Sequence, residues 1–131
     1  MKLYGTWHLV ATVGTDDQGQ PSHRPFGAEP FGVLCFTPND RMICAVCNNA
    51  VDLSEEDSPR EYASYGGPFT FNGTTLVTTV DMASDPARLG TQQVRKVRFD
   101  GKRLTLTPPA RTFKGIVQHR DLIWEQVSTS V

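Results

Sequence analysis

A glutamine and an arginine two positions apart, Gln93 and Arg95, are the side chains best suited to do chemistry in this sequence. They lie in the alternating segment Gln92–Phe99, where they share one face with apolar residues while the other face is mostly charged and polar. The apolar companions predict that both side chains point into the protein. A buried guanidinium is costly unless it is paired, and its fixed fork suits a carboxylate or an enolate oxygen.

An inward Arg95 therefore needs an anionic or carbonyl partner, and two kinds are open. One is an internal carboxylate, for which Asp81 and Glu125 are the candidates, and the other is a bound ligand. Desolvation would raise the pKa of an inward Asp81, which suits a group that transfers protons. If the partner is an internal carboxylate, Arg95 has a structural role only. The other alternative is that a shift in strand register turns Arg95 outward.

Aromatic and hydroxyl side chains would complete such a site. Tyr62 and Tyr65 lie in a segment expected to cover one end of the fold, where either hydroxyl would meet a ligand or both rings would simply pack. Trp124 is predicted to point inward, lining a ligand site or filling the core. Thr79 is a further ligand-binding candidate, on a segment, Thr74–Met82, whose two faces both mix polar and apolar residues.

Histidine and cysteine patterns give weaker signals. His119 and Asp121 would be neighbours on one strand face, but alternation with Trp124 turns both toward solvent. Cys44 and Cys47 are three apart on a predicted strand, so they point to opposite faces and make neither a redox pair nor a metal site. No cofactor-binding fingerprint is present, so we expect no metal and no cofactor, and free thiols at all three cysteines.

Alternation of apolar and polar residues dominates the chain and predicts an all-β fold. The predicted strands are Gly5–Val13, Phe31–Thr37, Arg41–Cys47, Pro68–Phe71, Thr74–Met82, Gln92–Phe99, Arg103–Thr107 and Gln118–Val127. The inner face of the first strand is predicted to carry Trp7, Leu9, Ala11 and Val13. About eight strands, several joined by hairpins, favour a single antiparallel up-and-down β-barrel with room for one small ligand.

Two segments interrupt the alternation and are candidate lids over the barrel. Gly14–Pro30 contains three prolines and is expected to be a loop, with Phe26 and Phe31 as apolar anchors. Asp52–Ser64 is expected to form a lid as a short helix, whose length Pro59 would limit, or as a loop. Long loops in small domains are usually functional or disordered.

Composition limits the classes of partner. The chain has 131 residues, with 13 Lys and Arg against 14 Asp and Glu, and a formal net charge of -1. Such a domain lacks the basic surplus of a nucleic-acid binder, and no apolar run approaches the roughly 20 residues of a membrane helix. The absence of a signal-peptide pattern and the odd number of cysteines favour a cytoplasmic protein. The length predicts one domain, residues 1–131.

A series of motifs, in order along nearly the whole chain, carries a family resemblance. They are Gly5-Thr6-Trp7, Phe36-Thr37-Pro38, Arg41-Met42, the segment from Tyr62 through Tyr65-Gly66-Gly67, Gly90-Thr91-Gln92-Gln93-Val94-Arg95, Leu104-Thr105-Leu106-Thr107 and Leu122-Ile123-Trp124-Glu125. The first resembles the G-x-W signature of lipocalins, and the whole resembles the small bacterial lipocalin-like domain proteins. The resemblance implies an up-and-down barrel with a small-molecule cavity, and no particular reaction. The chain departs from these relatives at Thr78-Thr79, where they often carry histidine, and at Trp124-Glu125-Gln126, where they often have Trp-x-Arg.

Three functions are therefore open. The first is binding of a small, mostly apolar molecule with a polar or anionic group, held by Arg95, Gln93 and a tyrosine. The second is a cofactor-free isomerase, cyclase or lyase acting on a small carbonyl or carboxylate compound, in which Arg95 stabilises an enolate-like oxygen and Asp81 or Tyr65 moves a proton. The third is a homodimer formed through exposed apolar residues, for which the candidates are Val10, Leu34 and Phe36.

Overall fold

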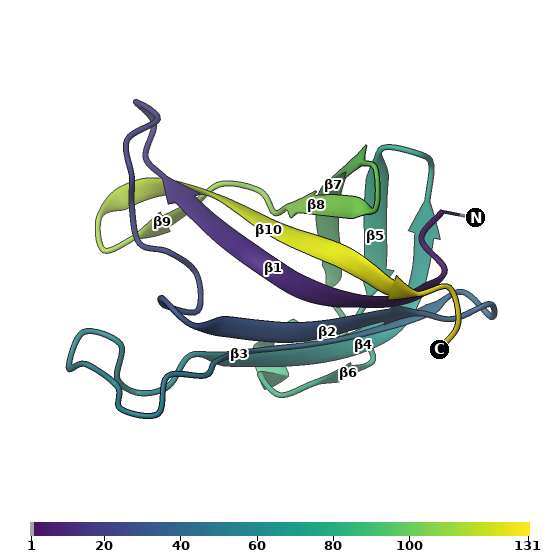
Figure 1. Cartoon of the computed structure of the whole chain (residues 1–131), viewed down its shortest axis with the longest axis horizontal. Helices are drawn as coiled ribbons and strands as arrows, with labels where there is room; N and C mark the ends of the chain where they lie inside the picture. Colours follow the sequence, from purple (N-terminus) through teal and green to yellow (C-terminus); the bar gives the residue numbers. More distant parts are fainter. Residues whose placement is uncertain (1) are drawn as a thin grey trace.

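The computed structural model describes residues 2–131, which form an antiparallel sheet with almost no helix (Figure 1). The strands are β1 (Gly5–Thr15), β2 (Pro30–Phe36), β3 (Arg41–Asn48), β4 (Tyr62–Phe71), β5 (Thr75–Thr79), β6 (Met82–Ala83), β7 (Gln92–Asp100), β8 (Arg103–Thr107), β9 (Arg111–Phe113) and β10 (Ile116–Ser128). One short 3₁₀ turn, η1 (Pro86–Arg88), follows β6. Within residues 2–131, no helix has the length and apolar character needed to cross a membrane.

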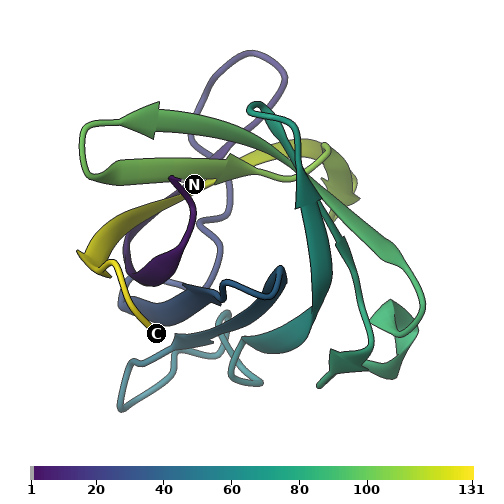
Figure 2. The ribbon, with the colours of Figure 1, turned by 90° about the vertical axis from the view of Figure 1, so that its right-hand side faces the viewer.

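The sheet closes on itself. Its hydrogen-bonded order is β1-β2-β3-β4-β5-β7-β8-β10, and β10 also pairs with β1, which completes the ring seen end-on in Figure 2. Two short strands lie off the ring, with β6 beside β4 and β9 beside β10. Closure removes the exposed edges of an open sheet. The predicted all-β, single up-and-down antiparallel barrel is confirmed.

Both termini lie at the same end of the barrel (Figure 1), and the core residues Leu3 and Trp7 come from the N-terminal segment there. The indole N–H of Trp7 donates to the carbonyl oxygen of Leu3 at 2.9 Å, which fastens the N-terminal turn across this end. Leu34, Phe36 and other buried residues pack around them. The core cluster extends from this end along the barrel to Tyr65, Leu106 and Trp124.

The first strand does not keep one face throughout. Trp7 and Leu9 are buried as predicted, but a register shift between Leu9 and Ala11 reverses the alternation. Thr12 then faces inward, and Val13 is 41% exposed. The prediction for Ala11 and Val13 was wrong because an extra residue in a strand turns every later side chain to the other face.

The segment Asp52–Ser64 contains no helix, so of the two predicted forms of the lid, a short helix or a loop, the helix is wrong. Residues 52–61 form bends and turns, held in part by the Ser54 hydroxyl, which accepts from the Asp57 amide at 3.2 Å, and β4 begins at Tyr62. The segment lacks an apolar stripe that a helix would bury, and Pro59 interrupts it. The lids are therefore loops.

The predicted strand Thr74–Met82 is two strands. It divides into β5, which lies between β4 and β7, and β6, which pairs with β4 alone. Leu34 and Phe36 are both fully buried, so their predicted role as exposed dimer contacts is wrong, while Val10 is 39% exposed. A homodimer through Val10 remains a prediction.

Gly67 marks the place where β4 and the β5–β6 connection approach most closely. A Cβ atom there would lie 1.9 Å from the carbonyl oxygen of Thr79, which is backbone and has little freedom to move. We predict that Gly67→Ala lowers the free energy of unfolding by roughly 3 kcal/mol or more. Urea denaturation followed by circular dichroism measures it.

Gly90→Ala is the matched control for Gly67→Ala. Its Cβ would meet open space, but its φ of +78° disfavours alanine, so the expected loss is about 1 kcal/mol. Equal losses in the two variants would mean that the contact with Thr79 is not the constraint at Gly67.

Candidate functional site

A cavity of about 170 Å³ lies inside the barrel, and part of its lining belongs to the apolar core. Its walls come from the inner faces of the strands and from the loops at the end opposite the termini. The lining residues are Pro25, Phe26, Cys44, Val46, Glu61, Tyr62, Ala63, Tyr65, Arg88, Arg95, Leu106, Pro108, Arg111, Arg120, Leu122 and Trp124. The apolar residues form a surface for a hydrocarbon or aromatic body, and the polar ones are mostly positively charged.

Four arginines and one carboxylate surround this cavity. Arg88, Arg95, Arg111 and Arg120 all line it, and Glu61 is the sole acidic lining residue in the described part of the chain. The whole chain carries a formal net charge of -1, so the positive charge here is a local concentration. The electrostatic potentials of neighbouring positive charges add, and a low dielectric strengthens them. The cavity therefore attracts an anion.

Gln93 holds two of these arginines with one oxygen. Its Oε1 accepts from Arg88 Nη1 at 2.9 Å and from Arg95 Nη2 at 2.8 Å. Arg95 also donates to the Val94 carbonyl at 2.9 Å. Alternation places Gln93 and Arg95 half-buried on the inner face of β7, as predicted, although Gln93 supports the arginines and does not itself line the cavity.

Neither carboxylate predicted for Arg95 is its partner. Asp81 lies on the outside of the barrel in a bidentate pair with Arg41, at 2.7 and 2.9 Å, and Glu125 is exposed on the outer face of β10. The hydrogen bond from Arg41 lowers the pKa of Asp81. The predicted inward Asp81 with a raised pKa is therefore wrong, because alternation with the buried Thr78 and Val80 places residue 81 on the outer face.

The surroundings of Arg120 disfavour its positive charge. Arg120 donates to the Pro109 carbonyl at 2.9 Å, but its Nε is buried without a hydrogen-bond partner among the described residues. Burial, together with the neighbouring charges of Arg111, Arg95 and Arg88, lowers the pKa of Arg120 to about 10. A negatively charged ligand would relieve that repulsion.

Tyr65 and Cys44 face each other across β3 and β4 inside the cavity. Burial raises the pKa of Tyr65 to about 12, with Cys44 adding to the shift and Arg95 and Arg88 opposing it. Burial likewise raises the pKa of the Cys44 thiol to about 12. Both groups are protonated at neutral pH, so each acts as a hydrogen-bond donor and neither as a ready base or thiolate. The guanidinium of Arg88 lies 5.2 Å from the centre of the Tyr65 ring, a cation–π contact.

Trp124 contributes a second donor without an acceptor. Its side chain is 1% exposed and lines the cavity, as predicted, and its indole N–H has no partner among residues 2–131. Buried donors are nearly always paired, so Trp124 and Arg120 together mark a site that lacks acceptors. A ligand with oxygen atoms supplies acceptors.

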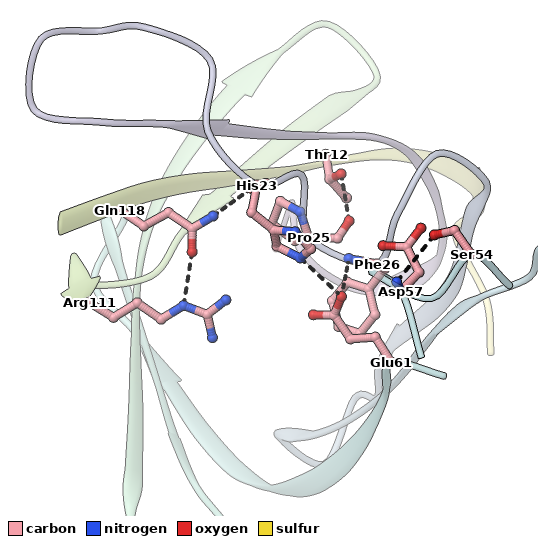
Figure 3. A network of polar contacts seen from close by, with 9 residues as sticks. All are labelled: Thr12, His23, Pro25, Phe26, Ser54, Asp57, Glu61, Arg111 and Gln118. Carbon is pink, nitrogen blue, oxygen red and sulfur yellow. Dashed lines mark hydrogen bonds and ion pairs between the residues drawn. The ribbon is translucent and has the colours of Figure 1, made fainter. Parts of the chain in front are cut away.

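The loop after β1, residues 16–29, lies across this end and is fastened at several points (Figure 3). Thr12 Oγ1 donates to the Pro25 carbonyl at 2.8 Å, and Gln118 Nε2 donates to the His23 carbonyl. The amide of Phe26 donates to Glu61 Oε1 at 2.7 Å, and His23 Nε2 lies 3.6 Å from the same oxygen. Of the two predicted apolar anchors of this loop, Phe26 lines the cavity, whereas Phe31 lies outside against His8.

Other predicted residues have mixed positions. Tyr62 is 55% exposed but reaches the rim of the cavity. Thr79 is exposed, and its neighbour Thr78 faces inward with 1% exposure, so the predicted position of Thr79 in the cavity is wrong. Register shows why, because Thr78 pairs with two inward residues, Phe69 and Gln93.

The position of His119 and the free state of the three cysteines agree with those predicted from the sequence. His119 is exposed and its Nε2 lies 2.8 Å from Asp17 Oδ1, so it forms no acid–base pair with Asp121. All three cysteines are free, as predicted.

Sequence reasoning missed Arg88, Arg111, Glu61 and the role of Arg120. Arg120 could have been found, because it alternates with Trp124 on the inner face of β10. Arg88 ends a short 3₁₀ turn and Arg111 begins a three-residue strand, so no periodicity points to either.

Tyr65 should make stability depend on alkaline pH. Its pKa is 10.0 in an ordinary environment and about 12 here, so its stabilising contribution is complete below pH 10 and lost as pH rises through 12. We predict that the free energy of unfolding of the wild type falls between pH 10 and 12 and that Tyr65→Phe removes on the order of 2 kcal/mol of this fall. Denaturant titrations at several pH values measure it. Tyr62→Phe, at the exposed rim, is the control, and an equal effect in both variants would contradict the assignment to Tyr65.

Comparison with known proteins agrees with the architecture. A family model described as a lipocalin-like domain matches residues 4–127. No curated protein and no solved structure gives a match to the chain. Because the match covers nearly the whole barrel, from the turn before β1 to the end of β10, the chain belongs to the lipocalin-like domain family.

Proposed function

We propose that this barrel binds a small organic anion, with an apolar or aromatic body inside the cavity and a carboxylate or enolate oxygen beside the arginines. The observation that carries the proposal is the excess of four arginines over one glutamate around a partly enclosed cavity. Glu61 accepts from the Phe26 amide with one carboxylate oxygen, Oε1, and its charge partly offsets that of Arg120. The lining residues in the described part of the chain still carry more positive than negative charge.

The dimensions and the donors support a small ligand with few polar atoms. A cavity of about 170 Å³ is smaller than the roughly 300–1,000 Å³ of sites for drug-sized molecules. Apolar contact comes from Phe26, Leu122 and the ring of Trp124. The hydroxyl of Tyr65 and the guanidinium forks offer donors to a planar oxyanion.

The charge of the ligand is the first property to test. Isothermal titration calorimetry with benzoate, phenylacetate and phenylbutanoate, each against its methyl ester, should give binding of acids and little binding of esters. We predict that Arg120→Gln weakens acid binding by about 10- to 100-fold, the range expected for a charged hydrogen bond. The same change should raise the melting temperature of the unliganded protein, because it relieves repulsion among buried arginines.

Arg98→Gln is the matched control, since Arg98 is exposed on the outer face of β7. It removes the same charge and should leave acid affinity within about twofold. Equal binding of acids and esters, or an equal loss in Arg98→Gln, would reject a site built on the inner arginines.

A second candidate function is proton transfer on a carbonyl compound in the same cavity. The protonated Tyr65 hydroxyl lies on the cavity wall together with Arg95 and Arg88, a combination that would stabilise an enolate oxygen. Asp81 cannot take part from outside the barrel, so the cavity carboxylate available as a base is Glu61. Removal of a proton next to the carbonyl group would be the first step of the cofactor-free isomerase, cyclase or lyase reaction considered from the sequence.

Deuterium exchange tests that step without knowledge of the product. With phenylpyruvate in D₂O, we predict that the protein accelerates loss of the C3 proton signal and that Tyr65→Phe slows it at least tenfold. Tyr65→Phe should still bind phenylacetate, which separates catalysis from binding. Exchange no faster than in buffer, or unchanged by Tyr65→Phe, would leave binding as the function.

A further inference from the structure

The barrel wall has an opening between β7 and β10. The ladder between β7 and β8 starts at Lys96 and Thr107, so residues 92–95 of β7 pair with β5 on one side and have no partner on the other. Pro108 and Pro109 follow β8 and have no amide hydrogen, so they cannot extend this ladder.

β10 has a matching interruption. It pairs with β9 at residues 116–118 and with β8 at residues 122–125, which leaves residues 119–121 unpaired toward β7. The connection through Pro108 and Pro109 crosses the space between the two interruptions. The wall at this point is therefore made by side chains and one loop, not by backbone hydrogen bonds.

A hollow on the outside of the barrel occupies this opening. It is lined by Arg88, Gln92, Gln93, Val94, Arg95, Pro108, Pro109 and Arg120. Gln92 and Val94 point outward from β7 while Gln93 and Arg95 point inward, so the hollow wraps around the free edge of the strand.

The same arginines line the inner cavity and the outer hollow. Arg88, Arg95 and Arg120 belong to both, together with Pro108. Arg95 donates to the carbonyl of Val94 on one side of the opening, and Arg120 donates to the carbonyl of Pro109 on the other. No carboxylate lines the hollow in the described residues, so its charge is uniformly positive.

We infer that the ligand spans the wall, with its apolar body in the cavity and its anionic group in this opening between β7 and β10. This inference rests on the proposed function and adds a shape to it. The ligand is an elongated organic acid, in which a chain separates the carboxylate from the apolar end. The three shared guanidiniums hold the carboxylate, and the outer hollow is its route in and out.

Gln92 allows a test that leaves the cavity untouched. It is exposed, lines the outer hollow and does not line the cavity. Gln92→Glu should weaken binding of 4-phenylbutanoate by about two- to threefold at low ionic strength, and Gln92→Lys should strengthen it by a similar factor. Both effects should shrink at about 0.3 M salt, where exposed charges are screened. 6-Phenylhexanoate should bind more tightly than benzoate to the wild type.

Gln18 supplies the matched control, because it is exposed in the loop after β1. Gln18→Glu and Gln18→Lys change the net charge equally and should leave the affinity unchanged. If Gln92 variants have no effect, or Gln18 variants have the same effect, the anion does not sit in the opening. The proposed function still stands in that case if Arg120→Gln weakens binding. Failure of every acid to bind overturns both proposals.

Discussion

Repulsion among arginines inside a closed barrel is the constraint on which the rest of this structure depends. Four guanidiniums line one cavity, against one acidic side chain in the described part of the chain, Glu61. Burial lowers the pKa of Arg120 most, and the charges of the other three arginines lower it further. Such a cluster destabilises the empty protein unless something negative joins it, so it is readily explained as part of a binding site.

The fold accommodates this arginine cluster because the two ends of the barrel have different roles. Around Trp7, apolar packing at the end near the termini supplies stability without reference to any ligand. At the other end, Gln93 shares one oxygen between Arg88 and Arg95, and a loop held by Thr12 and Glu61 partly encloses the cavity. Enclosure strengthens each electrostatic interaction in the cavity, because water screens it less.

Much of the barrel was predictable, and so was part of the site. Alternation placed Arg95 and Trp124 on inner faces, because a strand with one buried face has no freedom to exchange its faces. The same rule failed at Val13, where a bulge shifts the count by one residue. It could not place Thr79 or Asp81, because both faces of Thr74–Met82 mix polar and apolar residues and the pattern there does not say which face is buried.

The sequence by itself determined the all-β class, the closed barrel and the inward direction of Arg95, because these follow from periodicity and turn chemistry between neighbours in the chain. Only the tertiary structure decided which charges share the cavity. Arg88 and Arg111 lie outside any long alternating segment, and they reach the site through a short turn and a three-residue strand. Whether Arg95 meets a carboxylate or another arginine depends on register between distant strands, and nothing local in the sequence specifies that register.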